Sequence, residues 1–162
     1  MHSDAITLRL PDAAATEALG EWLGRQLQPG EVLGLTGPMG AGKTTLVRGL
    51  ARGLAVTDPD AVSSPTYLLV VEHPGPKPLL HADAYLPAKL DHFLAEGGLD
   101  YLLDRQAVVA VEWADRIARW LPAHTLWLQL EPAPDRGRLA ILHSGRGGHF
   151  PWLAAAAILF PG

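Results

Sequence analysis

Residues 37–44 read Gly-Pro-Met-Gly-Ala-Gly-Lys-Thr and match the pattern G-x-x-x-x-G-K-[ST] at every fixed position. Glycines allow such a segment to curl until several backbone N–H groups point inward at one anion. An apolar run that predicts a strand, Val32 to Thr36, comes before it, and a helical pattern from Lys43 to about Ala55 follows it. The helix would direct its partly positive N-terminus at the same anion. This strand–loop–helix pattern predicts a phosphate-binding loop inside an α/β fold.

The residue types in the loop predict how a nucleotide would be held. Lys43 is one of only three lysines in the chain, and a lysine at this place reaches the β- and γ-phosphates while the following hydroxyl, here Thr44, binds Mg²⁺. The chain contains no asparagine, which excludes a guanine-reading N-K-x-D loop, so we expect ATP. The candidate nucleotide-binding residues of the loop are Gly37, Pro38, Met39, Gly40, Ala41, Gly42, Lys43, Thr44 and Thr45.

Two carboxylates end apolar runs that predict strands. Asp83 ends the run that begins at Leu79, and Glu112 ends the more apolar run that begins at Val108. Phosphate-loop enzymes place an acidic residue at such a position to hold Mg²⁺ or polarise the attacking water. Each residue could instead be an ordinary strand-end carboxylate. Trp113, directly after Glu112, could be either a packing residue or a nucleotide contact.

Two further polar features lie close to these carboxylates in the sequence. Thr66 follows the loop helix and is suited to a switch that senses the γ-phosphate, although the same residues would also form an ordinary turn into a strand. His81 and Asp83 are two residues apart and therefore share a strand face. Because no third ligand lies nearby, we interpret them as a polar pair and not as a zinc site.

Strand-like and helical patterns alternate first, and strands adjoin later, which predicts a P-loop α/β sandwich with a mixed, mainly parallel sheet and antiparallel strands near the C-terminus. We expect a single ATPase domain over residues 1–144, and an apolar tail, residues 145–162, that is packed on it or partly disordered. The other predicted strands are Ile6–Leu10, Thr66–Glu72, Thr125–Leu130 and Arg138–His143, and the other predicted helices are 12–29, Asp91–Leu103 (broken at Gly97–Gly98) and Ala114–Leu121.

Composition and charge exclude several classes of protein. Apolar residues make up 48% and charged residues 19% of the chain, as in a globular domain, and the absence of cysteine excludes disulfides and thiolate metal sites. The net charge of −4 argues against unaided binding to nucleic acid. The longest apolar stretch, Trp152–Phe160, is far shorter than the roughly 20 residues that cross a bilayer. We therefore expect a cytoplasmic protein with no membrane association.

The motifs together resemble the TsaE (YjeE) family in order and spacing. The resemblance covers roughly residues 5 to 143. Of the single motifs, only the phosphate loop is a specific signal, whereas the whole series of motifs, in this order, is specific for the family. The segments that carry it are 37–50, Ser64–Tyr67, His81–Tyr85, Gly97–Tyr101 and Val111–Trp113.

The resemblance implies a Mg²⁺-dependent ATPase needed to make threonylcarbamoyladenosine beside the anticodon of tRNAs that read codons beginning with A. Such an ATPase works with TsaB and TsaD, resets that complex by hydrolysis, is weak alone, and meets tRNA mainly through its partners. The resemblance implies that Asp83 and Glu112 serve the metal and the water and that Thr66 is the switch. It also implies that Thr16 and Arg138 approach the nucleotide.

The chain departs from the family pattern at two positions. Leu86 follows Tyr85 where the family usually has arginine, so another group must replace any contact made by that arginine. Pro38 stands where an acidic residue is common. Two other functions stay open from the residues alone: a P-loop kinase acting on a small molecule, and an assembly module that senses a nucleotide without essential hydrolysis.

Overall fold

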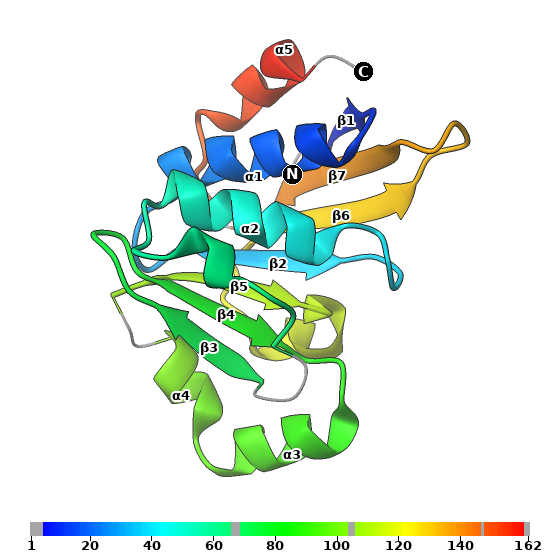
Figure 1. The fold of residues 1–162 in the computed structure, drawn as a ribbon. Helices are drawn as coiled ribbons and strands as arrows, with labels where there is room; N and C mark the ends of the chain where they lie inside the picture. Colours follow the sequence, from blue (N-terminus) through cyan, green and yellow to red (C-terminus); the bar gives the residue numbers. More distant parts are fainter. Residues whose placement is uncertain (1–4, 66–68, 104–105, 147, 161–162) are drawn as a thin grey trace.

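The computed structural model of the chain describes residues 5–65, 69–103, 106–146 and 148–160 (Figure 1). Its strands are β1 (Ile6–Leu10), β2 (Val32–Thr36), β3 (Val70–His73), β4 (Leu79–Asp83), β5 (Val108–Glu112), β6 (Leu126–Pro132) and β7 (Arg138–Ser144). Its α-helices are α1 (Ala13–Gln26), α2 (Lys43–Gly53), α3 (Pro87–Ala95), α4 (Gly98–Leu103) and α5 (Ala156–Leu159). Short 3₁₀ helices are η1 (Pro59–Ala61), η2 (Ala114–Trp120) and η3 (Leu153–Ala155).

The described strands form one sheet in the order β1-β7-β6-β2-β5-β4-β3. The four central strands, β6, β2, β5 and β4, are parallel, and antiparallel pairs lie at both edges. The predicted mixed sheet with antiparallel C-terminal strands is therefore confirmed, and the β3–β4 hairpin adds a second antiparallel edge. Because parallel strands end at the same side of a sheet, the loop after β2 and the carboxylates that end β4 and β5 lie together.

Both faces of the sheet are covered, which explains the continuous apolar run of β5. Val108 and Ala110 belong to the core beneath α1 and α2, whereas Val109 and Val111 belong to the core beneath α3, α4 and η2. Successive side chains of a strand point to opposite faces, so a strand covered on both sides needs apolar residues at every position. The last residue of β5, Glu112, is the polar exception.

Helices α1 and α2 lie side by side on one face and cross closely through glycines (Figure 1). A Cβ atom on Gly49 would lie 2.0 Å from the carbonyl oxygen of Glu17, and one on Gly20 would lie 2.1 Å from that of Leu46. Both contacts would be with backbone, which cannot move as a side chain can. The close crossing places α2, and with it the end of the phosphate loop, firmly against α1.

We expect Gly49→Ala to lower the free energy of unfolding by about 1–3 kcal/mol, since the added methyl group must push the two helices apart. Helix propensity alone predicts the opposite sign, because alanine is favoured over glycine by about 1 kcal/mol within a helix. Urea unfolding measures the difference. Arg48→Ala on the same helix is the control and should stay within about 0.5 kcal/mol of the unchanged protein. An unchanged or raised stability of Gly49→Ala would contradict the tight crossing.

Three predicted elements differ in detail. The strand predicted from Thr66 is described from Val70 onward, and residues 66–68 lie outside the described part. The helix predicted from Asp91 begins earlier because Pro87 occupies its first turn, where proline is favoured. The predicted break is confirmed at Gly97, whose φ is 78°. The helix predicted over 114–121 is a 3₁₀ helix.

The C-terminal segment packs on α1 and β1. Phe150, Leu153 and Ala156 are buried in the same core as those elements. Trp22 of α1 lies edge-on to Trp152, with their ring centroids 5.4 Å apart, and also contacts Phe160. Among the described residues, no helix has both the length and the hydrophobicity that crossing a membrane requires.

Candidate functional site

The phosphate loop connects β2 to α2 in the conformation that its glycines permit. Gly37, Gly40 and Gly42 all have positive φ, and a Cβ atom on Gly37 would lie 2.1 Å from the carbonyl oxygen of Leu130. Gly42 is the N-cap residue of helix α2, and no side chain caps the first turn. The first N–H groups of an uncapped helix are available to an anion. The loop therefore has the geometry of an anion cradle.

Lys43 is buried inside this cradle. Its Nζ donates hydrogen bonds to the carbonyl oxygens of Gly37 (2.5 Å) and Pro38 (2.9 Å), and lies 4.2 Å from the ring centroid of Trp113. Burial lowers the pKa of Lys43 from its usual value of 10.5, while the carboxylates of Glu112 and Asp83 favour the charged form. A triphosphate in the cradle would favour the charged form of Lys43 further.

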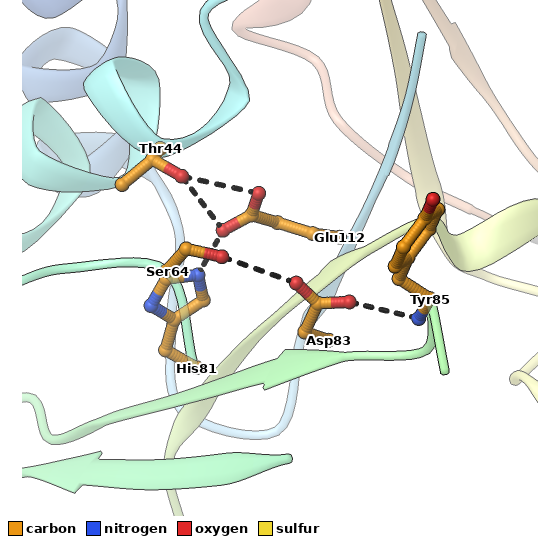
Figure 2. Close-up of polar contacts among 6 residues, drawn as sticks. All are labelled: Thr44, Ser64, His81, Asp83, Tyr85 and Glu112. Carbon is orange, nitrogen blue, oxygen red and sulfur yellow. Dashed lines mark hydrogen bonds and ion pairs between the residues drawn. The ribbon is translucent and has the colours of Figure 1, made fainter. Parts of the chain in front are cut away.

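Glu112 lies at the centre of the polar contacts in Figure 2. Its two carboxylate oxygens lie 3.2 and 3.3 Å from Oγ1 of Thr44, the first hydroxyl of α2. Its Oε2 also lies 2.5 Å from Nε2 of His81 on β4. The side chains of Glu112 and His81 are 4% and 0% exposed, respectively, so the contact between them is buried.

Asp83 is the neighbour of Glu112 on the adjacent parallel strand. Its Oδ2 accepts a hydrogen bond from Ser64 (3.2 Å) and its Oδ1 accepts one from the backbone N–H of Tyr85 (2.8 Å) (Figure 2). The predicted polar pair of His81 with Asp83 is wrong: the histidine pairs with Glu112 across the strands instead. Strand register, which a linear pattern does not contain, determines this partner.

One cavity of about 340 Å³ brings most of the predicted site residues together. It joins the loop and the start of α2 to the ends of β4 and β5. Five of its lining residues come from outside the loop–helix segment: Ser64, Asp83, Tyr85, Glu112 and Trp113. Thr66 lies outside the described residues, so its predicted switch role stays a prediction.

Thr16 and Arg138 lie on a second, smaller cavity of about 170 Å³ on the other side of the loop. Thr45 and two loop glycines line both cavities. Arg138 holds the loop from outside, since its Nε donates to the carbonyl oxygen of Ala41 (3.0 Å) and its Nη2 to that of Gly40 (3.1 Å). These two residues therefore adjoin the loop without reaching the carboxylates.

Aromatic residues and an arginine form the rim next to Leu86. The rings of Tyr85 and Trp113 are in contact, tilted by 43° with their centroids 4.8 Å apart, and Trp113 adopts a positive φ of 58°. The guanidinium of Arg116 lies 5.1 Å from the Tyr85 ring centroid, and its Nη1 donates to the Tyr85 carbonyl oxygen (2.8 Å). Arg116 could not be predicted as a site residue because it belongs to no motif and reaches the rim only through the fold.

The oxygen atoms in the cavity fit a magnesium ion. Thr44, Glu112 and Asp83 offer one hydroxyl and two carboxylates, and Mg²⁺ prefers such hard oxygen ligands, usually one or two carboxylates together with water and substrate phosphates. Within the described part of the chain, no group of three His, Cys, Asp or Glu residues is placed to hold a metal.

Comparisons with known proteins agree on one family. The family model described as "Threonylcarbamoyl adenosine biosynthesis protein TsaE" matches residues 10–140. The chain is 39% identical over 135 residues to the tRNA threonylcarbamoyladenosine biosynthesis protein TsaE of Mycobacterium tuberculosis, covering 77% of this chain and 78% of that protein. The corresponding Bacillus subtilis protein is 37% identical over 124 residues, covering 76% and 75%.

A solved structure resembles the whole fold. The crystal structure of Bacillus subtilis YdiB superposes with a TM-score of 0.76 at 28% sequence identity, covering 100% of this chain and 99% of that one. The likeness extends beyond the region that the family model matches.

Proposed function

Because the chain belongs to the TsaE family of tRNA threonylcarbamoyladenosine biosynthesis proteins, we propose that it is a Mg²⁺-dependent ATPase that drives this modification. One observation carries the proposal. The loop amides, the Lys43 ammonium, the Thr44 hydroxyl and the two strand-end carboxylates, Asp83 and Glu112, all meet at one cavity. Phosphoryl transfer depends mainly on positioning and on electrostatic stabilisation, and these groups supply both.

The loop holds the phosphates in the proposed reaction. Backbone N–H groups of the loop and the N-terminus of α2 would bind the phosphate oxygens, and the ammonium of Lys43 would turn from the carbonyls of Gly37 and Pro38 to the β- and γ-phosphates. Trp113 forms a wall beside that ammonium. Thr16 and Arg138, on the second cavity, are suited to the part of the nucleotide that extends beyond the phosphates.

Thr44, with Asp83 and Glu112, would hold the magnesium ion. When bound, the ion neutralises charge that develops on the phosphate oxygens. Glu112 faces the Thr44 hydroxyl with both of its carboxylate oxygens. We propose that it orients the attacking water and accepts its proton. Asp83, fixed by Ser64 and the Tyr85 amide, supports the metal site from the adjacent strand.

We propose TsaB and TsaD as partners in the cytoplasm, with tRNA engaged through their complex. The net charge of −4 is consistent with a protein that does not grip RNA by itself. Hydrolysis by the isolated chain should then be slow. In this scheme ATP hydrolysis resets the complex between rounds of modification.

The guanidinium of Arg116 is proposed to replace the arginine that the family usually has at the position of Leu86. It lies over the Tyr85 and Trp113 rings at the cavity rim. We expect Arg116→Ala to lower kcat/KM for ATP about fivefold in the full complex, which corresponds to the roughly 1 kcal/mol that an exposed charge contributes. The control, Arg119→Ala, removes an arginine that stacks on Trp120 instead, and should change kcat/KM less than twofold. Equal effects of both variants would contradict this assignment.

Steady-state ATP turnover, measured with and without TsaB, TsaD and tRNA, tests the proposed function. We expect slow turnover alone and a rise of about tenfold or more with the partners, since P-loop proteins often gain catalytic groups in trans. Transfer of phosphate to a metabolite without partners would favour the small-molecule kinase. Full tRNA modification by a complex whose Glu112→Gln chain binds ATP but does not hydrolyse it would favour the assembly module.

A further inference from the structure

We infer that His81 is a positioning residue that holds the Glu112 carboxylate in its working orientation; the inference rests on the proposed function. His81 is completely buried, and its Nε2 lies 2.5 Å from Oε2 of Glu112. The proposed role of Glu112 requires an ionised carboxylate, which can only accept hydrogen bonds, so Nε2 would carry the proton in this contact. The bond fixes Oε2 of Glu112, while the Thr44 hydroxyl faces both carboxylate oxygens, with Oε1 at 3.2 Å and Oε2 at 3.3 Å.

The sheet determines where both side chains lie. His81 pairs in register with Ala110 on the adjacent parallel strand, and Glu112 is two residues further along that strand. The two side chains are thus diagonal neighbours on the same face of a sheet whose central strands are buried. Neither backbone can shift without disturbing the core, so the contact is set by the fold and not by a flexible loop.

The two side-chain contacts of Glu112, with Thr44 and with His81, would respond differently to a bound magnesium ion. Thr44 has one hydroxyl proton, and its oxygen is the atom proposed to bind magnesium. The His81 contact approaches Glu112 from the sheet, on the side away from the α2 N-terminus (Figure 2). It can therefore persist while the Thr44 contact changes. Partners that orient a carboxylate in this way typically affect activity 10–100-fold when removed.

The other ring nitrogen supports a dedicated role. Nδ1 of His81 is buried and has no hydrogen-bond partner among the described residues, and the same is true of Nε2 of the neighbouring His73. The two rings lie 6.5 Å apart. An unpaired buried polar atom lowers the stability of the folded state. If His81 served only to fill space, an apolar residue could replace it without loss of stability. The bond to Glu112 is the one polar contact that the described structure shows for His81.

Four variants test the inference in the TsaB–TsaD complex with Mg²⁺-ATP. His81→Leu removes the donor and should lower kcat about 10–100-fold while KM changes less than threefold. His81→Gln keeps an N–H donor at a similar reach and should recover most of kcat. His73→Leu and His73→Gln, the matched controls on the neighbouring strand, should keep kcat within twofold. Thermal unfolding of each variant shows whether it is folded.

Nitrogen NMR of histidine-labelled protein gives a readout that does not need hydrolysis. We expect the unchanged chain to show His81 protonated at Nε2 with a proton signal shifted strongly downfield, and Glu112→Gln to reduce that shift. Protonation at Nδ1 alone, or a Gln variant no better than Leu, or an equal loss of kcat in His73→Leu, would overturn the inference. If the unchanged complex shows the signal but does not hydrolyse ATP, the proposed ATPase activity is wrong. The inference about His81 is then overturned as well, because Glu112 has no reaction to perform, although the hydrogen bond itself is present.

Discussion

Replacing Lys43 by alanine is expected to weaken Mg²⁺-ATP binding about 100-fold and to remove measurable hydrolysis. The ammonium is buried in the loop, and the only partners that it contacts there are carbonyl oxygens and the Trp113 ring among the described residues. A charge-assisted contact to phosphate in such an enclosed place contributes up to about 3 kcal/mol, which corresponds to roughly a hundredfold change in Kd. Titration with a fluorescent ATP analogue measures the affinity.

Lys89→Ala is the matched control for this prediction. Lys89 is an exposed lysine on α3, outside both cavities that adjoin the loop. We expect its affinity for the analogue to stay within twofold of the unchanged chain. Retention of full affinity by a folded Lys43→Ala variant would mean that the nucleotide is not held by the loop.

Glu112→Gln is expected to lower kcat about 10²–10³-fold and to change the affinity for Mg²⁺-ATP by no more than a few-fold. The amide keeps the size of the side chain and can still accept a hydrogen bond from His81, but it cannot take a proton from water. Loss of a general base typically costs 10²–10⁴-fold in rate. Single-turnover hydrolysis in the TsaB–TsaD complex separates this effect on chemistry from any effect on binding.

The control for this second prediction is Glu96→Gln, which neutralises an exposed carboxylate at the end of α3. Its rate should match that of the unchanged chain. Full hydrolysis by Glu112→Gln would remove Glu112 from the chemistry and leave Asp83, the neighbouring carboxylate, as the candidate.

Much of the candidate site could be predicted because its parts are short, contiguous patterns. The strand of residues 32–36 and the helix that begins at Lys43 are confirmed with those starting points. The strands that end at Asp83 and Glu112 are confirmed as well. Apolar runs bounded by a polar residue define such strand ends locally, so their place in the fold follows once the sheet is parallel.

The rest of the site depends on contacts between segments distant in the sequence. The partner of His81 follows from the register of β4 against β5, and a shift of two residues would have made the pairing different. Arg116 reaches the rim because Trp113 turns the chain through a positive φ directly after β5. Neither effect has a signature in composition or periodicity.

In the packing of the helices and the C-terminal segment, too, some features had a local sequence signal and others depend on contacts between distant residues. The start of α3 at Pro87 had a local signal, proline in a first helical turn, that the apolar spacing obscured. The contact of Trp152 with Trp22 joins residues far apart in the chain. The close crossing at Gly49 likewise depends on the backbone of α1, which lies far from α2 in the sequence.

Isothermal titration calorimetry of ATP into the intact, folded chain, with and without Mg²⁺, tests the central claim most directly. We predict saturable binding at one site, strengthened by Mg²⁺, because the loop amides and Lys43 hold the phosphates while Thr44 and the two carboxylates accept the metal. Absence of any heat of binding under both conditions would contradict the claim that residues 37–44 form a nucleotide site.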